Sequence, residues 1–189
     1  MSRIAGVQYL ALCDITSGAG SSVTYGEPVE IKQFISFSAT KNFSETSWYS
    51  NDVTEEIFQG VVDVDLEIVV GRLSGDLKAK IMGHTYDAEK GVITEKADDE
   101  QPEFGLIVVL TQLPSGKLCQ AYTRVKLKVE SVNGETKTDS ITDSQVTISG
   151  KAIADANGVI CHTLDSNDTD ADETTVNNWK TAFYTGASN

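Results

Sequence analysis

Few residues of this chain have side chains suited to catalysis, and they form no recognisable set. The two histidines are His84 and His162, and Cys161, one of three cysteines, directly precedes His162. A hydrolase needs a nucleophile held beside a base, but neither histidine lies in a known nucleophile motif. We therefore interpret these residues as ordinary residues near strand edges, and we predict that the protein is not an enzyme.

An acidic run over residues 165–173 is the best candidate for a metal site, because hard cations such as calcium prefer clustered carboxylates. Its alternate aspartates, beginning at Asp168, have the spacing of a calcium loop. With Asp168 as the first ligand, however, Glu173 stands where the loop needs glycine and Trp179 where it needs glutamate. The sequence also lacks the glycine patterns of nucleotide-binding loops and the paired Cys/His motifs of zinc sites. No metal or cofactor is assigned, and calcium binding by the run stays open.

A second set of carboxylates lies in the most regular segment of the chain, residues 60–70. Apolar and acidic residues alternate there, in the order Val62, Asp63, Val64, Asp65, Leu66, Glu67, Ile68. A period of two predicts a strand with one buried face and one solvated, acidic face. Two carboxylates on one face can act as acid and base, but pairing of Asp63 and Asp65 with Lys126 and Lys128 is the more ordinary explanation.

The stretch before this strand, residues 40–59, interrupts the strand pattern and is rich in aromatic residues. Phe43, Trp48, Tyr49 and Phe58 are mixed there with small polar residues. A connection of this length is uncommon in a compact domain unless it carries a function. We therefore expect a structured loop with a functional role.

Composition limits the classes of protein to which the chain can belong. Its 189 residues, with a hydrophobic fraction of 40% and 3 prolines, are typical of a folded domain. A formal net charge of −13 disfavours a dedicated nucleic-acid-binding protein, because the phosphate backbone is repelled. Three widely separated cysteines argue against a secreted disulfide framework and favour a reducing cytoplasm. Apolar stretches fall short of the roughly 18 to 20 residues of a membrane span, so we expect no membrane association.

Strands predominate among the elements that the sequence predicts. Hydrophobic patterns and turn residues place strands at residues 7–15, 29–39, 60–70, 104–111, 118–130 and 146–153. A helix is predicted over residues 73–83, with Ser74 as a possible N-cap and Gly83 closing its C-terminal end. A small hairpin is predicted around Lys90 and Gly91.

The chain divides into two parts by composition. Residues 1–154 are predicted to form a β-rich domain that includes the stretch 40–59. Residues 155–189 are predicted to form an acidic linker followed by a short C-terminal helix, in which Val176, Trp179 and Phe183 share one side. This apolar side should dock on the same subunit or on a neighbouring one.

Several short motifs occur in a fixed order along the chain. They are Gly6-Val7, Val23-Thr24-Tyr25-Gly26 before Pro28, Gly83-His84-Thr85-Tyr86-Asp87, Gly91-Val92, and Ala97-Asp98-Asp99 before Pro102. Together they resemble the major tail protein, or tail tube protein, family of long-tailed bacteriophages (siphophages). The resemblance covers most of the chain, and the motif at residues 83–87 is its most specific part.

The resemblance implies a mainly β fold, with two packed antiparallel sheets arranged as a sandwich or small barrel and one flanking helix. It also implies a structural virion protein whose homo-hexameric rings stack into the tail tube through which DNA is ejected. Assembly would take place in the host cytoplasm. The implied partners are other copies of the chain, the tape measure, tail terminator and distal tail proteins, and passing DNA that is not specifically bound.

The same resemblance implies roles for particular residues. It assigns residues 40–59 to contacts between stacked rings, with the aromatic residues Phe43, Trp48, Tyr49 and Phe58 as the contacting side chains. It also turns the acidic residues of strand 60–70 toward the channel, namely Asp63, Asp65 and Glu67. Lys126 and Lys128 lie on an equivalent polar face and would partly neutralise such an acidic wall.

One other class remains open from the residues alone. A β-sandwich binding module that recognises a carbohydrate or a cell-surface ligand would use Trp48 and Tyr49 as a stacking platform. Such a module would be a monomer with a ligand, whereas a tail tube protein would assemble.

Overall fold

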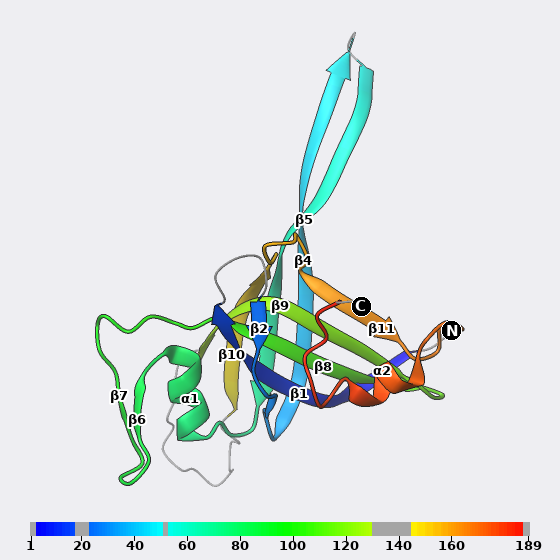
Figure 1. Ribbon diagram of the computed structural model, residues 1–189. Coiled ribbons are helices and arrows are strands. Elements are labelled where there is room, and N and C mark those ends of the chain that lie inside the picture. The colour runs from blue at the N-terminus through cyan, green and yellow to red at the C-terminus, as the bar shows by residue number, and fades with distance from the viewer. Residues whose placement is uncertain (1–2, 18–22, 51–52, 130–144, 187–189) are drawn as a thin grey trace, which may run out of the picture.

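The computed structural model describes residues 3–17, 23–50, 53–129 and 145–186, with the side chains of Ser17 and of residues 46–59 left out. Strands dominate this part of the chain (Figure 1). The elements are β1 (Arg3–Ser17), β2 (Val23–Tyr25), β3 (Val29–Glu30), β4 (Phe34–Ser50), β5 (Val53–Val70), α1 (Gly75–Met82), β6 (Thr85–Asp87), β7 (Val92–Thr94), β8 (Phe104–Leu113), β9 (Lys117–Val129), β10 (Val146–Ile153), β11 (Cys161–Asp165) and α2 (Glu173–Asn178). None of the helices described is both long and apolar enough to cross a membrane.

Within the described residues the strands form two antiparallel sheets. The large sheet has nine strands in the order β2-β1-β8-β9-β10-β5-β4, with β3 also paired to β1 and β11 also paired to β9. The small sheet is the β6–β7 hairpin predicted around Gly91. A mainly β fold with a flanking helix and a short C-terminal helix is thereby confirmed. The large sheet does not close into a barrel, because the strand order ends at β4 without returning to β1.

The large sheet curves around one main core. This core contains Leu12 of β1, Leu66 of β5 and Leu127 of β9, although β1 and β5 lie far apart in the strand order. Helix α1 covers it through Leu77 and Ile81, which are four residues apart and therefore lie on one side of the helix. Burial of these apolar side chains is the main contribution to the stability of the subunit.

Helix α1 begins and ends where the sequence predicted. Ser74 is the N-cap residue in an extended conformation, and Asp76 in the first turn interacts favourably with the helix dipole. Gly83 follows the helix with φ of 76°, and the next amide, that of His84, donates to the carbonyl of Ala79 at 2.8 Å. Glycine is needed at this position because a Cβ atom would overlap the carbonyl of Glu100.

Strand β8 is buried on both of its faces. Leu106 and Val108 face the main core, whereas Ile107 and Val109 face a second core on the other side of the sheet. A strand buried on both faces has no polar side to alternate. This explains the nearly continuous apolar run that predicted it.

The second core lies under the C-terminal segment. Trp179 and Phe183 are 3% and 8% exposed and pack against residues of β1, β8 and β9. Phe183 stacks on Tyr25 with ring centroids 3.8 Å apart, and Gly105 leaves room for both rings. Trp179 and Phe183 therefore dock on their own subunit. They follow helix α2, which ends at Asn178 and buries none of its own residues, so they do not share one side of it with Val176 as predicted. Asp172 caps that helix by accepting a hydrogen bond from the amide of Thr175 at 2.8 Å.

The predicted acidic linker contains an additional strand. β11 pairs with the first half of β9, from Tyr122 to Leu118. Beyond it, Asp165 accepts a hydrogen bond from Gln112 at 2.9 Å, and Asn167 donates to the same buried glutamine at 2.6 Å. The sequence did not predict this strand, because it is short and only Cys161 and Leu164 of its described residues pack against a core.

Strands β4 and β5 form one long hairpin whose distal part stands clear of the body (Figure 1). The two strands stay paired from Phe34 and Val70 to Ser50 and Val53, with register shifts on the way. Residues 40–50 and 53–59 therefore form a two-stranded arm, where the sequence had predicted a structured loop. A hairpin that stands apart from the body has no buried face, so its sequence need not alternate between apolar and polar residues. We call residues 40–50 and 53–59 the hairpin arm.

Replacing Phe183 with Ala should lower the free energy of unfolding by about 3–5 kcal/mol, because it removes a buried ring from the second core. Phe43→Ala is the matched control. The Phe43 side chain is 63% exposed, so its loss should change the free energy of unfolding by less than about 0.5 kcal/mol. Urea denaturation of unassembled subunits measures both values, and equal losses would contradict docking of the C-terminal segment.

Candidate functional site

The outer surface of β4, β5, β10 and β9 carries a row of polar and charged residues on each strand. The groove over them has a volume of about 630 Å³. We call this surface the polar face, and its charged members are Asp63, Asp65 and Glu67 of β5, Lys151 of β10, Arg124, Lys126 and Lys128 of β9, and Glu103 just before β8. The pleat fixes this arrangement, because the alternate residues of the same strands, such as Val64, Leu66 and Leu127, fill the main core.

Lys151 pairs with two carboxylates of the acidic row of β5. Its Nζ atom lies 3.2 Å from a carboxylate oxygen of Asp63 and 3.2 Å from one of Asp65. Asn42 of β4 donates to both carboxylates from the other side, at 2.8 Å in the case of Asp65. Two adjacent acidic residues are therefore held in place by one ammonium and one amide group.

These contacts shift the pKa values of the groups involved. Hydrogen bonds from Asn42 and then from Lys151 lower the pKa of Asp65 from its usual value of 3.8. Hydrogen bonds to Asp63 and Asp65 raise the pKa of Lys151 from its usual value of 10.5. Both shifts favour the charged forms of Asp65 and Lys151.

A second ion cluster lies at the other side of the polar face. Arg124 makes two parallel hydrogen bonds to Glu103, of 2.9 Å from Nε and 2.8 Å from Nη2. Lys126 lies 3.9 Å from the same carboxylate. A bidentate arginine–carboxylate pair is geometrically specific as well as stronger than a single contact.

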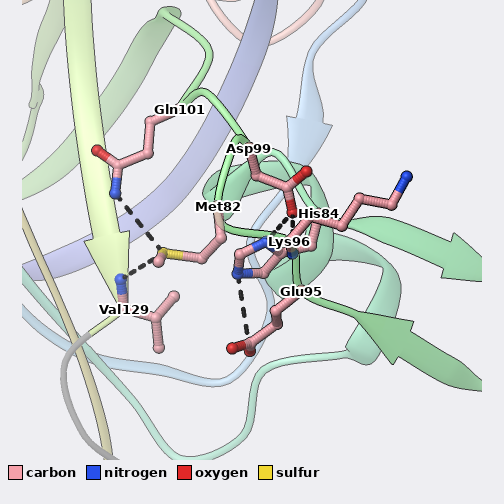
Figure 2. A network of polar contacts seen from close by, with 7 residues as sticks. All are labelled: Met82, His84, Glu95, Lys96, Asp99, Gln101 and Val129. Carbon is pink, nitrogen blue, oxygen red and sulfur yellow. Dashed lines mark hydrogen bonds and ion pairs between the residues drawn. The ribbon is translucent and has the colours of Figure 1, made fainter.

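The loop that carries Glu103 is attached to the end of helix α1 (Figure 2). His84 Nδ1 lies 2.7 Å from a carboxylate oxygen of Asp99, and its Nε2 lies 3.6 Å from Glu95. On the neighbouring side, the sulfur of Met82 accepts hydrogen bonds from the side chain of Gln101 at 3.9 Å and from the amide of Val129 at 3.3 Å. The motif at residues 83–87, through His84, thus positions the loop that carries Glu103 to the polar face.

The predicted partners of Asp63 and Asp65 were wrong. Strand β10 lies between β5 and β9, so the opposing residue on the neighbouring strand is Lys151, which pairs in register with Asp65. Lys126 is directed to Glu103 instead. Neither Lys151 nor Glu103 was selected from the sequence, because each is an isolated charge whose role depends on strand order.

Cys161 and His162, which were first considered as a catalytic pair, do not interact as a nucleophile and a base. Burial raises the pKa of the Cys161 thiol and lowers the pKa of His162, and the sulfur contacts the carbonyl of His162 rather than its ring. His162 packs edge-on against Tyr184 with centroids 5.2 Å apart. Within the described part of the chain, no three metal-binding side chains come together, either at residues 165–173 or elsewhere.

The hairpin arm holds the aromatic residues that were assigned to ring stacking. The exposed side chain of Phe43 lies on β4 near the base of the arm. Trp48, Tyr49 and Phe58 belong to the paired strands, but their side chains lie outside the described residues. All four positions lie on the hairpin arm, whose base adjoins the acidic row, because Asn42 next to Phe43 pairs with Asp63.

The large sheet is antiparallel and open, and a hairpin projects from it beside the polar face. The family model for the phage tail tube protein matches residues 41–185, which is well over half of the chain. The chain therefore belongs to the phage tail tube protein family and is a structural protein of bacteriophage tails. The match extends from the hairpin arm through the C-terminal segment. None of the curated proteins matches the chain.

Replacing Lys151 with Met should raise the pKa of Asp65 toward its usual value, because the nearby cation is lost. Asn42→Ala should raise it further, since the hydrogen bond from Asn42 is the larger cause of the shift. A carboxylate with a lowered pKa stabilises the folded state above its unfolded pKa, and that stability is lost as the pH falls through the folded value. An NMR titration of the side-chain carboxyl tests both variants, and an unchanged pKa in both would show that these contacts do not form in solution.

Proposed function

We propose that this protein forms homo-hexameric rings that stack into the tail tube, through which DNA is ejected. The observation that carries the proposal is the open sheet. Within the described residues, β4 pairs with β5 alone, and the first part of β1 pairs with β8 alone. Exposed strand edges promote pairing with other chains unless they are covered. The ring number comes from the family resemblance.

A groove between the two open strands supports the same proposal. This groove, which we call the seam, has a volume of about 490 Å³ and is lined by residues of β1, β4, β5, β8 and β9. Ile4 and Ile35, on opposite sides of it, are 58% and 52% exposed. Pairing of each edge with a neighbouring copy would cover these side chains and close the ring by symmetry.

The polar face is proposed to line the channel, with Asp63, Asp65 and Glu67 exposed to passing DNA. Three points favour this orientation. The face is charged and hydrated, it lies on the strands next to the open edge of β4, and its opposite side is fully occupied by the main core. DNA would pass without specific binding, because Lys151 and Arg124 are already paired with carboxylates of the same face.

The hairpin arm is proposed to contact the next ring. It projects from the body, and its strands carry Phe43, Trp48, Tyr49 and Phe58. Aromatic side chains are frequent among the residues that dominate interface energies. In the assembled virion the ends of the tube would contact the tail terminator and distal tail proteins, and the lumen would hold the tape measure protein. Assembly would take place in the host cytoplasm.

Negative-stain electron microscopy of the purified protein should show rings or tubes. We expect each subunit interface to bury upwards of about 2,000 Å². Ile35→Asp should abolish rings, because it places a charge at the seam, while the subunit stays folded. Val92→Asp is the matched control, since Val92 is 50% exposed on β7 and far from the seam. A protein that stays monomeric at high concentration with tail initiation components would contradict the proposal.

Replacing both Trp48 and Tyr49 with Ala should abolish long tubes and leave folded subunits or single rings. The loss in each subunit is repeated around the ring, so about 2 kcal/mol for each anchor is enough to prevent stacking. Microscopy gives the tube length, and circular dichroism checks the fold. Tubes of normal length would place stacking elsewhere, and an unfolded subunit would show that these side chains belong to a core.

A further inference from the structure

The polar face is balanced in charge, although the chain as a whole carries −13. Four acidic residues lie on it, and four basic residues lie beside them: Asp63, Asp65, Glu67 and Glu103 against Arg124, Lys126, Lys128 and Lys151. The family resemblance implied an acidic wall that Lys126 and Lys128 partly neutralise. The neighbouring strands β9 and β10 supply the compensating charges, which strand order brings to the same surface.

The basic residues form a row whose spacing suits a polyanion. Arg124, Lys126 and Lys128 alternate on β9, so their side chains leave the sheet at intervals of about 7 Å. Lys151 lies beside Lys126 in the register of β10 and β9. Such a row, left unpaired, would contact several phosphates of duplex DNA, and each contact would release counterions and add affinity.

The acidic residues occupy this row from both sides. Lys151 is directed toward β5 by Asp63 and Asp65, at 3.2 Å from each, whereas Arg124 and Lys126 are directed the other way by Glu103. Lys126 and Lys151 are neighbours in register, but their side chains are drawn in opposite directions by different carboxylates. Lys126 and Lys151 are each 56% exposed, so passing phosphates would still reach them.

We propose that the carboxylates of the polar face take the place of phosphates on the basic row, so that duplex DNA is neither held there nor strongly repelled. A purely basic face would bind DNA and stop it. A purely acidic face would repel DNA and oppose its entry. Pairing of acidic and basic residues within the subunit avoids both effects. The identity of the passing ligand rests on the proposed function, but the pairing and its test need only the isolated subunit.

The test is to neutralise the acidic residues and measure DNA binding by unassembled subunits. Asp63→Asn, Asp65→Asn and Glu67→Gln are combined in one variant, and binding of a fluorescent duplex of about 20 base pairs is followed by anisotropy at about 50 and about 200 mM salt. The wild-type protein should not bind detectably. The variant should bind at least about tenfold more tightly than wild type and lose that affinity at the higher salt.

A matched control distinguishes the effect of unmasking the basic row from the effect of a lower net negative charge. Asp168→Asn, Asp170→Asn and Glu89→Gln remove the same three charges from exposed positions away from the polar face and should leave binding undetectable. Adding Lys126→Gln and Lys128→Gln to the first variant should abolish the binding gained. If the first variant does not fold, Glu103→Gln frees Arg124 and Lys126 and should produce the same gain.

Three results would overturn the proposal: binding by the wild-type protein, no gain in a folded variant, or an equal gain in the control. None of them bears on whether rings and tubes form, which microscopy decides independently. Conversely, a subunit that never assembles but gains DNA binding on neutralisation would contradict the proposed function while supporting the pairing.

Discussion

The fold depends on a change of neighbour along β9 at Thr123. Residues 118–122 pair with β11, and residues 124–129 pair with β10. Thr123 is 2% exposed, and its hydroxyl donates to the carbonyl of Val159 at 2.6 Å, which satisfies a polar group where the pairing is interrupted. Because the sheet divides there, the C-terminal segment covers one half of its outer surface and leaves the other half as the polar face.

Local patterns predicted most elements, because those elements follow local rules. The alternation in β5, the apolar run of β8 and the caps of α1 at Ser74 and Gly83 all appeared as expected. Strand order depends on contacts between distant parts of the chain, so no local signal places β10 between β5 and β9. Asp63, Asp65 and Glu67 were therefore selected from the sequence, while Lys151 and Glu103 were missed. β11 was missed because its short sequence lies in an acidic stretch.

The polar face and the main core constrain each other through the pleat. A shift of β5 by one residue would turn Asp65 inward and Leu66 outward, so the register that buries the core also fixes the charged row. The same applies to β10, where Gly150 allows β9 to approach closely, because a Cβ atom there would contact Leu127 at 2.7 Å. The charge pattern of the surface is thus specified by apolar residues beneath it.

The contact between the two ends of the chain has a consequence for the order of folding. Tyr9 donates a hydrogen bond to the carbonyl of Lys180 at 3.2 Å, and Tyr25 stacks on Phe183. The outer side of β1 therefore stays bare until residues 179–183 have left the ribosome. Contacts over such sequence separations form slowly, and exposed apolar strands aggregate. The nascent chain is consequently most vulnerable during synthesis, when chaperone binding to β1 would be most effective.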